Sequence, residues 1–539
     1  MDTDMPAPKE EGRNQDADKP TVSHASSLSS KCDMCFFAAS LVSPMACAGI
    51  TFFGKDIYIL KFGADVGLMS AVGTVLAIVA PVINLLTGWC MEKIPLSTLF
   101  PWATWGRRAP WYLTHLVLTA FSTAALFLPV SFDPTFLCWW YLALALCSSW
   151  CLSVSFIAFE SARLEAYATK EERTEVEAVC KISGGAGAGT GILLPLIVAA
   201  GASRQVLQLM GLVALLVGLF SLVSIPVLRK ARLVFQPDGV GSFLSEFVSL
   251  LRVSTVWHLM AYRFTEDLLT TVAITATLYW VTFVEGLTGT ERSLFIALSG
   301  AAVAFSTIVM LPCWTQFFRI RRQGVNINVF CSRVMALGLL APVVLVMKTA
   351  LPSGVGFLAY IVLMQGSVAG QTFWRVAAMG WVVDEDCHAG DGKRREALLI
   401  GLVGFFASAG RAVGVGIVLL GLAYSGMEST NCDLECEGKG PSADGTDCVA
   451  ACDAQNLDRQ PPMVSTFLHL IYYAVVTTFQ VIAISLVYSF PICNARLDAI
   501  YAKQAELAAA ASAESGAAGR PQEARGQATP DAHDSGKEG

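Results

Sequence analysis

The stretch Trp381-Val-Val-Asp-Glu-Asp-Cys-His-Ala-Gly-Asp-Gly-Lys-Arg-Arg-Glu396 separates two long apolar runs of the chain. Eight of its sixteen residues are charged, whereas the run that follows it, about 397–424, contains one charge, Arg411. A short charged segment between two membrane-length apolar runs is typical of an aqueous turn in a multi-pass membrane protein. An arginine inside the next span is energetically costly, which suggests that it has a function.

The composition agrees with a membrane protein. Of the 539 residues, 54% are apolar and 15% are charged, whereas ordinary soluble domains contain about 25% charged residues. The net charge of −6 is modest and there is no large basic block, so nucleic acid is not an expected partner. The chain has no nucleophile–base set, metal-ligand cluster or cofactor motif. We therefore expect no enzyme activity, no metal and no cofactor.

Apolar runs that could span a membrane recur along most of the chain. About 20 helical residues cross the ~30 Å of hydrocarbon in a bilayer. Twelve such runs occur in two sets of six, at 36–60, 66–90, 110–131, 136–159, 178–200 and 205–228, and at 257–284, 293–314, 326–347, 354–383, 397–425 and 463–489. The sequence therefore predicts an all-α polytopic membrane protein with twelve transmembrane helices in two six-helix bundles, 34–228 and 256–490. Residues 229–255 form the central connection, and 1–33 and 491–539 form polar tails without a signal peptide.

The basic residues predict how the spans are oriented. Sixteen lysines and arginines lie in the connections after even-numbered spans, and six lie in the other connections. Because basic connections stay in the cytosol, we expect both termini, the central connection and the segment 381–396 on the cytosolic side. The connection 426–462 is then on the opposite side of the membrane.

Four of the sixteen cysteines lie in this last connection, as two C-x3-C pairs. Four thiolates could bind a structural zinc ion. Thiols outside the cytosol, however, are oxidised, so two disulfides are the favoured interpretation. The spacing leaves the pairing open. The candidate disulfide residues are Cys432, Cys436, Cys448 and Cys452.

Four segments carry a family resemblance. In chain order they are Trp105-Gly-Arg-Arg-Ala-Pro-Trp111, Lys170-Glu-Glu-Arg-Thr-Glu175, Asp384 with Gly392-Lys-Arg-Arg-Glu396, and Phe490-Pro-Ile-Cys-Asn-Ala-Arg-Leu-Asp-Ala-Ile500. Over about residues 34–505 the chain resembles the glycoside–pentoside–hexuronide:cation symporters of the major facilitator superfamily, which also include eukaryotic lysolipid and amino-acid carriers. The resemblance implies the major facilitator fold. It also implies a monomer that carries a sugar, a lysolipid or an amino-acid-like solute by alternating access.

The same resemblance implies a cytosolic gate. Arginines at these positions meet helix ends and acidic residues of neighbouring spans, and such ion pairs would hold one face of a carrier shut. A second interpretation is that they are only the basic anchors of cytosolic loops. The gate candidates are Arg107, Arg108, Arg173, Glu175, Asp384, Arg394 and Arg395.

The chain departs from the family at its cation site. There, aspartates of the second and fourth spans bind sodium or a proton, whereas this chain has Ala80, Asn84 and Phe156 at the corresponding positions. Sodium needs several hard oxygen ligands, and these three residues supply one uncharged carbonyl. We therefore favour a carrier that co-transports a proton or is uncoupled. Sodium-coupled symport of glycosides or lysolipids stays an alternative, as does a non-transporting receptor with the same fold.

Several carboxylates lie inside or at the ends of predicted spans. Glu160 stands where the family has a sugar-stacking tryptophan, and Glu266 and Asp267 lie in the seventh span. Any of the three could relay a proton. Arg263 is one helical turn before Asp267 and could neutralise it.

Cations also lie inside the spans. Arg375 and Arg411 could bind the carboxylate or phosphate of an anionic substrate, because the guanidinium fork fits two oxygens. Lys181 enters the fifth span where the family usually has arginine, and it could either reach into water or face the substrate. The sequence does not decide between an anion site and a proton relay.

Overall fold

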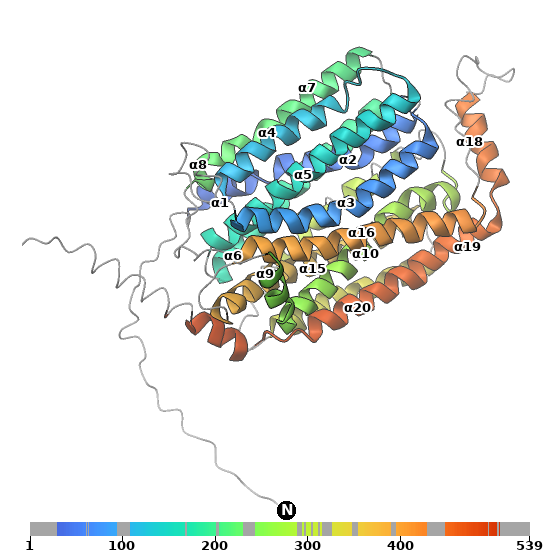
Figure 1. Ribbon diagram of the computed structural model, residues 1–539. Helices are drawn as coiled ribbons and strands as arrows, with labels where there is room; N and C mark the ends of the chain where they lie inside the picture. The colour runs from blue at the N-terminus through green and yellow to red at the C-terminus, as the bar shows by residue number, and fades with distance from the viewer. Residues whose placement is uncertain are drawn as a thin grey trace, which may run out of the picture.

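Figure 1 shows the computed structural model of the chain as a bundle of long helices. The structure describes residues 30–60, 62, 64–93, 108–167, 170–200, 204–229, 243–287, 294–295, 298–302, 305–310, 313–314, 326–347, 354–389, 395–427, 448–493, 495–503 and 506. These residues contain no β-strand.

The first half of the bundle covers six predicted spans. Its elements are α1 (Lys31–Ala39), α2 (Val42–Leu60), α3 (Val66–Lys93), α4 (Ala109–Ala125), α5 (Pro134–Ala166), α6 (Lys170–Ala200), α7 (Arg204–Phe220), a 3-10 turn (Ser221–Ser224) and α8 (Ile225–Leu228). The first span is divided between α1 and α2, and Pro44 in the first turn of α2 has no N–H to continue the preceding helix. α5 begins where the Asp133 carboxylate accepts a hydrogen bond from the Phe136 N–H at 2.8 Å.

The second half repeats this plan with more interruptions. Its elements are α9 (Phe243–Leu251), α10 (Ser254–Phe283), a π turn (Ser306–Met310), α13 (Ile327–Ala336), a 3-10 turn (Leu337–Leu340), α14 (Ala341–Val346), α15 (Val355–Ala389), α16 (Glu396–Tyr424), α18 (Cys448–Arg459), α19 (Pro462–Leu470), a π turn (Ile471–Val475) and α20 (Val476–Tyr488). Residues 495–503 are also helical. The eighth predicted span, 293–314, is described only in pieces.

Among the residues that the structure describes, seven helical stretches are long and apolar enough to cross a membrane by length and composition alone. α10 is not among them, although it occupies the seventh predicted span, because it carries Arg263, Glu266 and Asp267 in its middle. Interior charges in a membrane-length helix point to a function rather than to a soluble fold.

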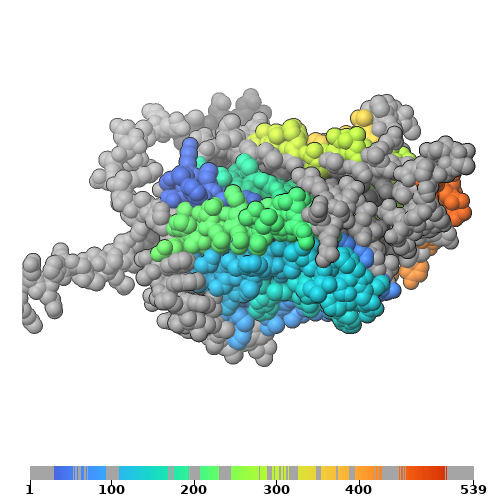
Figure 2. All heavy atoms as spheres, turned by 90° about the horizontal axis from the view of Figure 1, so that it is seen from above, coloured from blue at the N-terminus to red at the C-terminus, as the bar shows by residue number. Residues whose placement is uncertain are grey.

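The helices pack in two groups that meet along a central seam. In the first group α2 packs on α6, and α4 packs on α5 and α7 (Figure 2 shows α4 and α7 side by side). In the second group α10 packs on α16 and α20, and α13 packs on α15 and α20. Across the seam α3 and α5 pack on α16, and α6 packs on α15.

The two ends of the bundle are distinct. The start of α1 and the helical segment 495–503 lie at one end, which we call the terminus side, at the left in Figure 1. α18 lies at the other end, which we call the α18 side. Cys448 and Cys452 are one turn apart on α18, and Cys432 and Cys436 fall outside the described residues, so the two disulfides stay a prediction.

The segment 381–396 differs from the aqueous turn expected from its charges. Residues 381–389 continue α15, and Asp384 and Asp386 are buried at 2% and 3% exposure. The interpretation of the whole stretch as a solvated turn was therefore wrong. Two of its buried carboxylates lie beside arginines: Arg395 of the same stretch binds Asp386, and Arg108 lies 3.9 Å from Glu396.

Candidate functional site

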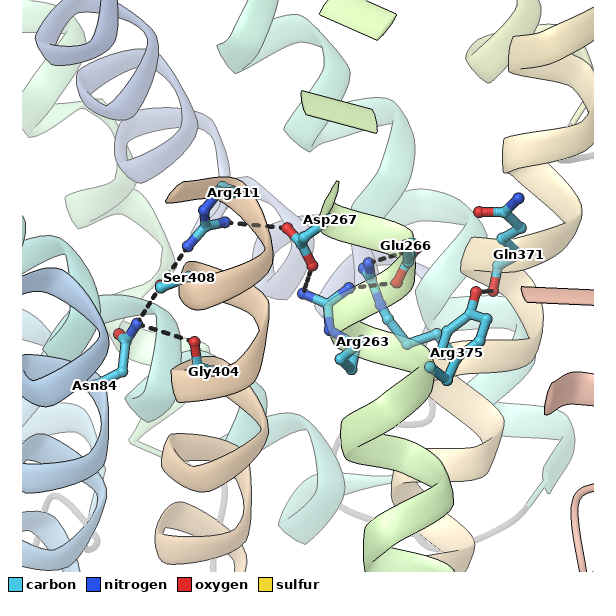
Figure 3. A network of polar contacts seen from close by, with 10 residues as sticks. Asn84, Arg263, Glu266, Asp267, Gln371, Arg375, Gly404, Ser408 and Arg411 are labelled. Atoms are coloured by element: carbon cyan, nitrogen blue, oxygen red, sulfur yellow. Dashed lines mark hydrogen bonds and ion pairs between the residues drawn. The ribbon is translucent and has the colours of Figure 1, made fainter. Parts of the chain in front are cut away.

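A network of charged side chains lies in the middle of the bundle, and Figure 3 shows it in detail. Its centre is Arg263 of α10. The Arg263 guanidinium contacts Glu266 Oε2 through Nη1 at 2.5 Å and Asp267 Oδ2 through Nη2 at 2.8 Å. The two carboxylates follow Arg263 by three and four residues, so one turn of helix brings all three groups together. The predicted pairing of Arg263 with Asp267 is present.

Two arginines from other helices complete the network. Arg375 of α15 donates from Nη1 to Glu266 Oε1 at 3.1 Å, and Arg411 of α16 donates from Nη1 to Asp267 Oδ1 at 3.2 Å. Each carboxylate therefore lies between Arg263 and one outer arginine. The side chain of Arg411 is 53% exposed, whereas that of Asp267 is 14% exposed.

Asn84 links this network to the first half of the bundle. Its Nδ2 atom donates to Ser408 Oγ at 2.8 Å and to the Gly404 carbonyl oxygen at 3.3 Å, both on α16. Ser408 Oγ also accepts a hydrogen bond from Arg411 Nη2 at 2.7 Å. Asn84, which occupies a position of the family's cation site, thus joins α3 to α16 by hydrogen bonds (Figure 3).

Hydrogen bonds among uncharged groups hold α15 beside α10 and α20. The Tyr262 hydroxyl donates to the Gln371 carbonyl oxygen at 3.1 Å, one turn before Arg375. The Gln371 side chain donates to Gln480 Oε1 at 2.7 Å. These buried contacts fix the helix that carries Arg375, because a buried polar group without a partner would cost free energy.

A second charged group lies in the first half, on α5 and α6. Arg163 binds the carboxylates of both Glu160 and Glu177, and it is only 3% exposed. It does not reach into water at the helix end. Lys181 Nζ lies 3.7 Å from Glu177 Oε1, one turn along α6. Glu177 was not among the predicted site residues, and its spacing of four residues before Lys181 was the signal that could have identified it.

The two charged groups face each other across the seam. Lys181 interacts electrostatically with Arg375 and Glu266, and Arg375 interacts in turn with Glu177 and Glu160. Together they place five cations and four carboxylates between the halves. With a rise of 1.5 Å per residue, these positions on α10, α15 and α16 lie roughly 13–23 Å from the helix ends at the terminus side.

A separate set of ion pairs lies at the terminus side. Arg108, which precedes α4, contacts Glu165 Oε1 through Nε at 2.9 Å and Glu92 Oε1 through Nη2 at 3.0 Å. Its Nη2 atom also lies 3.9 Å from Glu396 Oε2, at the start of α16. All four side chains are at most 2% exposed. Arg108 therefore connects the ends of α3 and α5 with the first residue of a helix in the other half.

Close backbone packing accompanies these ion pairs. Glu92 Oε1 accepts a hydrogen bond from the Ala397 N–H at 2.7 Å, so a carboxylate of α3 satisfies one free N–H of the first turn of α16. A Cβ atom at Gly401 would lie 2.6 Å from the Asn84 carbonyl oxygen, and one at Gly88 would clash with the Ala397 carbonyl. Only glycine allows the two helices to approach this closely.

Arg395 forms a third ionic contact, although Asp384, the nearest acidic gate candidate, is not its partner. Its guanidinium binds Asp386 at 2.5 and 3.1 Å and Glu246 of α9 at 2.7 Å, not Asp384. The reason is that α15 continues as a helix through both aspartates, so Asp384 and Asp386 point to different sides. Arg395 thereby attaches α9, in the central connection, to the second half.

The remaining gate candidates are only partly described. Arg107, Arg394 and the side chain of Arg173 fall outside the described residues, and Glu175 is exposed on α6. Sequence reasoning did not select Glu92, Glu246 or Asp386, because a carboxylate near a helix end is common and its partners come from distant segments.

With this geometry established, comparison with known proteins identifies the family. The family described as MFS/sugar transport protein matches residues 40–494. The chain belongs to this family. It is a multi-pass membrane transporter of the major facilitator superfamily, with a small-molecule substrate. Among curated proteins, none matches the chain significantly in sequence.

Two solved transporter structures are similar to the chain. A bacterial homologue of the iron transporter ferroportin, in an outward-facing state, superposes with a TM-score of 0.50 at 14% identity, over 81% of this chain and 99% of that one. The human organic anion transporter MFSD10 (TETRAN) superposes with a TM-score of 0.48 at 13% identity, over 84% of this chain and 96% of that one. The first of these supports the twelve-helix fold that the sequence predicts.

Proposed function

We propose that this major facilitator protein carries a small organic solute by alternating access, with the solute bound between the two halves beside Arg375 and Lys181. The halves would rock about the seam formed by α3 and α16. We further propose that the protein works as a monomer without enzyme activity, that the terminus side faces the cytosol, and that the cysteines of the 426–462 connection form disulfides on the other side.

One observation carries this proposal. The halves are joined at the terminus side by the Glu92–Ala397 hydrogen bond, while the charged groups lie deeper between them. Farther toward the α18 side of the same helices, a Cβ atom at Gly73 of α3 or at Gly416 of α16 would have no neighbour within 4 Å. Close packing at one end and free space toward the other support a carrier closed on one side.

The charged groups support a carrier that does not depend on sodium. Asn84 donates its amide hydrogens to Ser408 and Gly404, so its orientation serves the contact between halves. Glu266 and Asp267 are each neutralised by two arginines. We propose coupling to a proton or no coupling. Glu160 is the candidate proton carrier, because at 30% exposure it is the most accessible of the four carboxylates.

Uptake by the purified protein in proteoliposomes tests the proposal. The screen should cover sugars, lysolipids and amino acids, each with and without imposed sodium and pH gradients. We expect saturable uptake of at least one solute, unchanged by sodium. Sodium-dependent uptake would contradict the proposed coupling, and saturable binding without uptake would favour a receptor with a transporter fold.

A further inference from the structure

The accessible parts of the two charged groups are their cations. Lys181 is 27% exposed and Arg375 is 23% exposed, whereas their carboxylate partners Glu177 and Glu266 are 4% and 5% exposed. Glu160 is the exception, and its carboxylate is bound to Arg163. A solute that enters between the halves would therefore meet positive charge first.

The buried carboxylates already have inner arginines as counter-ions. Glu177 binds Arg163, and Glu266 binds Arg263 at 2.5 Å. Lys181 and Arg375 are thus second cations on carboxylates that already bind an arginine, and the five cations and four carboxylates of the two groups leave one net positive charge. The Lys181 Nζ atom is 3.7 Å from Glu177, beyond hydrogen-bond distance, and it has no hydrogen-bond partner within the described part of the chain.

Lys181 of α6 and Arg375 of α15 belong to opposite halves, and these two helices pack on each other across the seam, so the two like charges repel. The helix face that carries Lys181 borders open space, because a Cβ atom at Gly185, one turn along α6, would have no neighbour within 4 Å. Lys181 lies near the terminus-side end of the fifth predicted span, 178–200, where a charged side chain faces the protein interior or water rather than lipid. Because α6 packs on α15 across the seam, we place the open space beside Gly185 between the halves.

We propose that Lys181 and Arg375 bind the anionic group, a carboxylate or a phosphate, of an organic solute, which thereby bridges the two halves. This inference rests on the proposed function and specifies its substrate class. An anion would replace the repulsion between the two cations by two attractions, and would draw α6 and α15 together. The planar guanidinium suits two oxygens of the anion, and the ammonium acts as a compact point charge.

The charge of this space can be measured without knowing the substrate. Gly185→Cys would be made in a background in which the exposed cysteines Cys32, Cys35, Cys147 and Cys313 are replaced by serine. Rates of modification would be compared for two methanethiosulfonates of similar size, the anionic sulfonatoethyl and the cationic trimethylammonioethyl reagent. A second protein in which Cys32 alone of the four is retained supplies the reference ratio.

We expect the ratio of anionic to cationic modification rates at position 185 to be roughly tenfold higher than the reference ratio. One unpaired positive charge about 10 Å away, at an intermediate dielectric constant, would have an effect of this size. Lys181→Gln and Arg375→Gln should each reduce this preference, and Arg252→Gln, an exposed cation in the connection before α10, should not. Both test variants should fold, because Glu177 keeps Arg163 and Glu266 keeps Arg263. Equal rates, or faster modification by the cationic reagent, would overturn the inference.

A transport assay with matched solutes separates this inference from the proposed function. Proteoliposomes would be tested with glucose, glucosamine, glucuronate and glucose 6-phosphate, which differ in charge and in the kind of anion. Uptake of glucuronate or glucose 6-phosphate that is lost in Lys181→Gln and Arg375→Gln supports the inference. Uptake of glucose or glucosamine alone overturns it and leaves the carrier function intact. Anion selectivity at position 185 with no uptake of any probe supports the anion site and counts against the carrier function.

Discussion

The carboxylate of Glu92 accepts a hydrogen bond from the backbone N–H of Ala397 at 2.7 Å. The two residues are 305 positions apart and belong to different halves of the transporter. The same Glu92 oxygen lies 3.0 Å from Arg108 Nη2. One carboxylate therefore joins the first turn of α16 to the arginine before α4, at the end where the halves are closed.

Replacing Glu92 should open the terminus side. Glu92→Ala removes the bond to Ala397 and one of the two closest carboxylates of Arg108, and each hydrogen bond to a charged group contributes about 1.5–3 kcal/mol. We expect the open population to rise roughly tenfold or more. Spin labels at the exposed positions Lys31 and Arg252, one in each half, would measure this by their distance distribution.

Glu92→Gln is the informative companion to this variant. Its amide oxygen can still accept from Ala397, but it carries no charge for Arg108, so the shift should be smaller than with alanine. If both variants give the wild-type distance distribution, Glu92 does not hold the two halves together.

Glycines on α3 should differ sharply in their tolerance of a methyl group. A Cβ atom at Gly88 would clash with the Ala397 carbonyl, whereas one at Gly73 of the same helix would have no neighbour within 4 Å. Overpacking typically costs about 1–3 kcal/mol. We therefore expect Gly88→Ala to reduce uptake by roughly tenfold and Gly73→Ala to leave it unchanged.

Uptake rates at matched amounts of reconstituted protein would check this pair of variants. The two variants should give similar size-exclusion profiles. The added methyl group of Gly88→Ala destabilises the close packing of the two halves and not the fold of either half. Equal uptake by the two variants would mean that close approach of α3 and α16 is not needed for transport.

The sequence was sufficient for the fold because membrane helices must satisfy their own backbone hydrogen bonds and therefore appear as long apolar runs. The predicted helix bounds were less accurate where charged residues extend a helix beyond its apolar span. α6 begins at Lys170 rather than at 178, and α15 continues to Ala389, because Glu, Lys and Arg are good helix formers outside the membrane.

The site could be predicted only where its residues are close in sequence. Arg263, Glu266 and Asp267 fall within one helical turn, and their spacing identified a charged cluster in α10. The contact of Arg375 with Glu266 spans 109 positions, and the contact of Glu92 with Ala397 spans 305. Such pairs depend on how whole helices pack against each other, and a short sequence pattern does not predict this packing.

Replacing Arg263 should mainly lower the stability of the protein, whereas replacing Arg411 should mainly lower transport. Arg263, at 15% exposure, neutralises two carboxylates, and removing one partner of a buried ion pair costs about 3–5 kcal/mol. Arg411 is 53% exposed, and an exposed ion pair contributes at most about 1 kcal/mol. Arg263→Gln should lower the melting temperature markedly. Arg411→Ala should leave it nearly unchanged while abolishing uptake.

Thermal unfolding in detergent and uptake in proteoliposomes measure the two effects separately. Arg333→Gln, which removes an exposed arginine from α13, is the matched control and should change neither. Normal transport kinetics in Arg411→Ala would show that transport does not require this arginine, and a stable Arg263→Gln protein would show that the outer arginines alone can neutralise Glu266 and Asp267.

The last prediction concerns the attachment of α9 to the second half. Arg395 binds Asp386 of α15 and Glu246 of α9, and Glu246 is 8% exposed. Arg395→Gln leaves both carboxylates without this counter-ion, so α9 should detach more readily. Loss of hydrogen bonds to a charged group lowers the free energy of local opening by about 1.5–3 kcal/mol, which corresponds to roughly 10- to 100-fold faster amide exchange in residues 243–251.

Hydrogen exchange measured by mass spectrometry tests this, with Arg252→Gln as a control in the same connection. Because α9 lies next to the start of α10, faster exchange that spreads into α10 would mean that Arg395 stabilises the second half as a whole, and unchanged exchange in 243–251 would mean that apolar packing alone holds α9 in place.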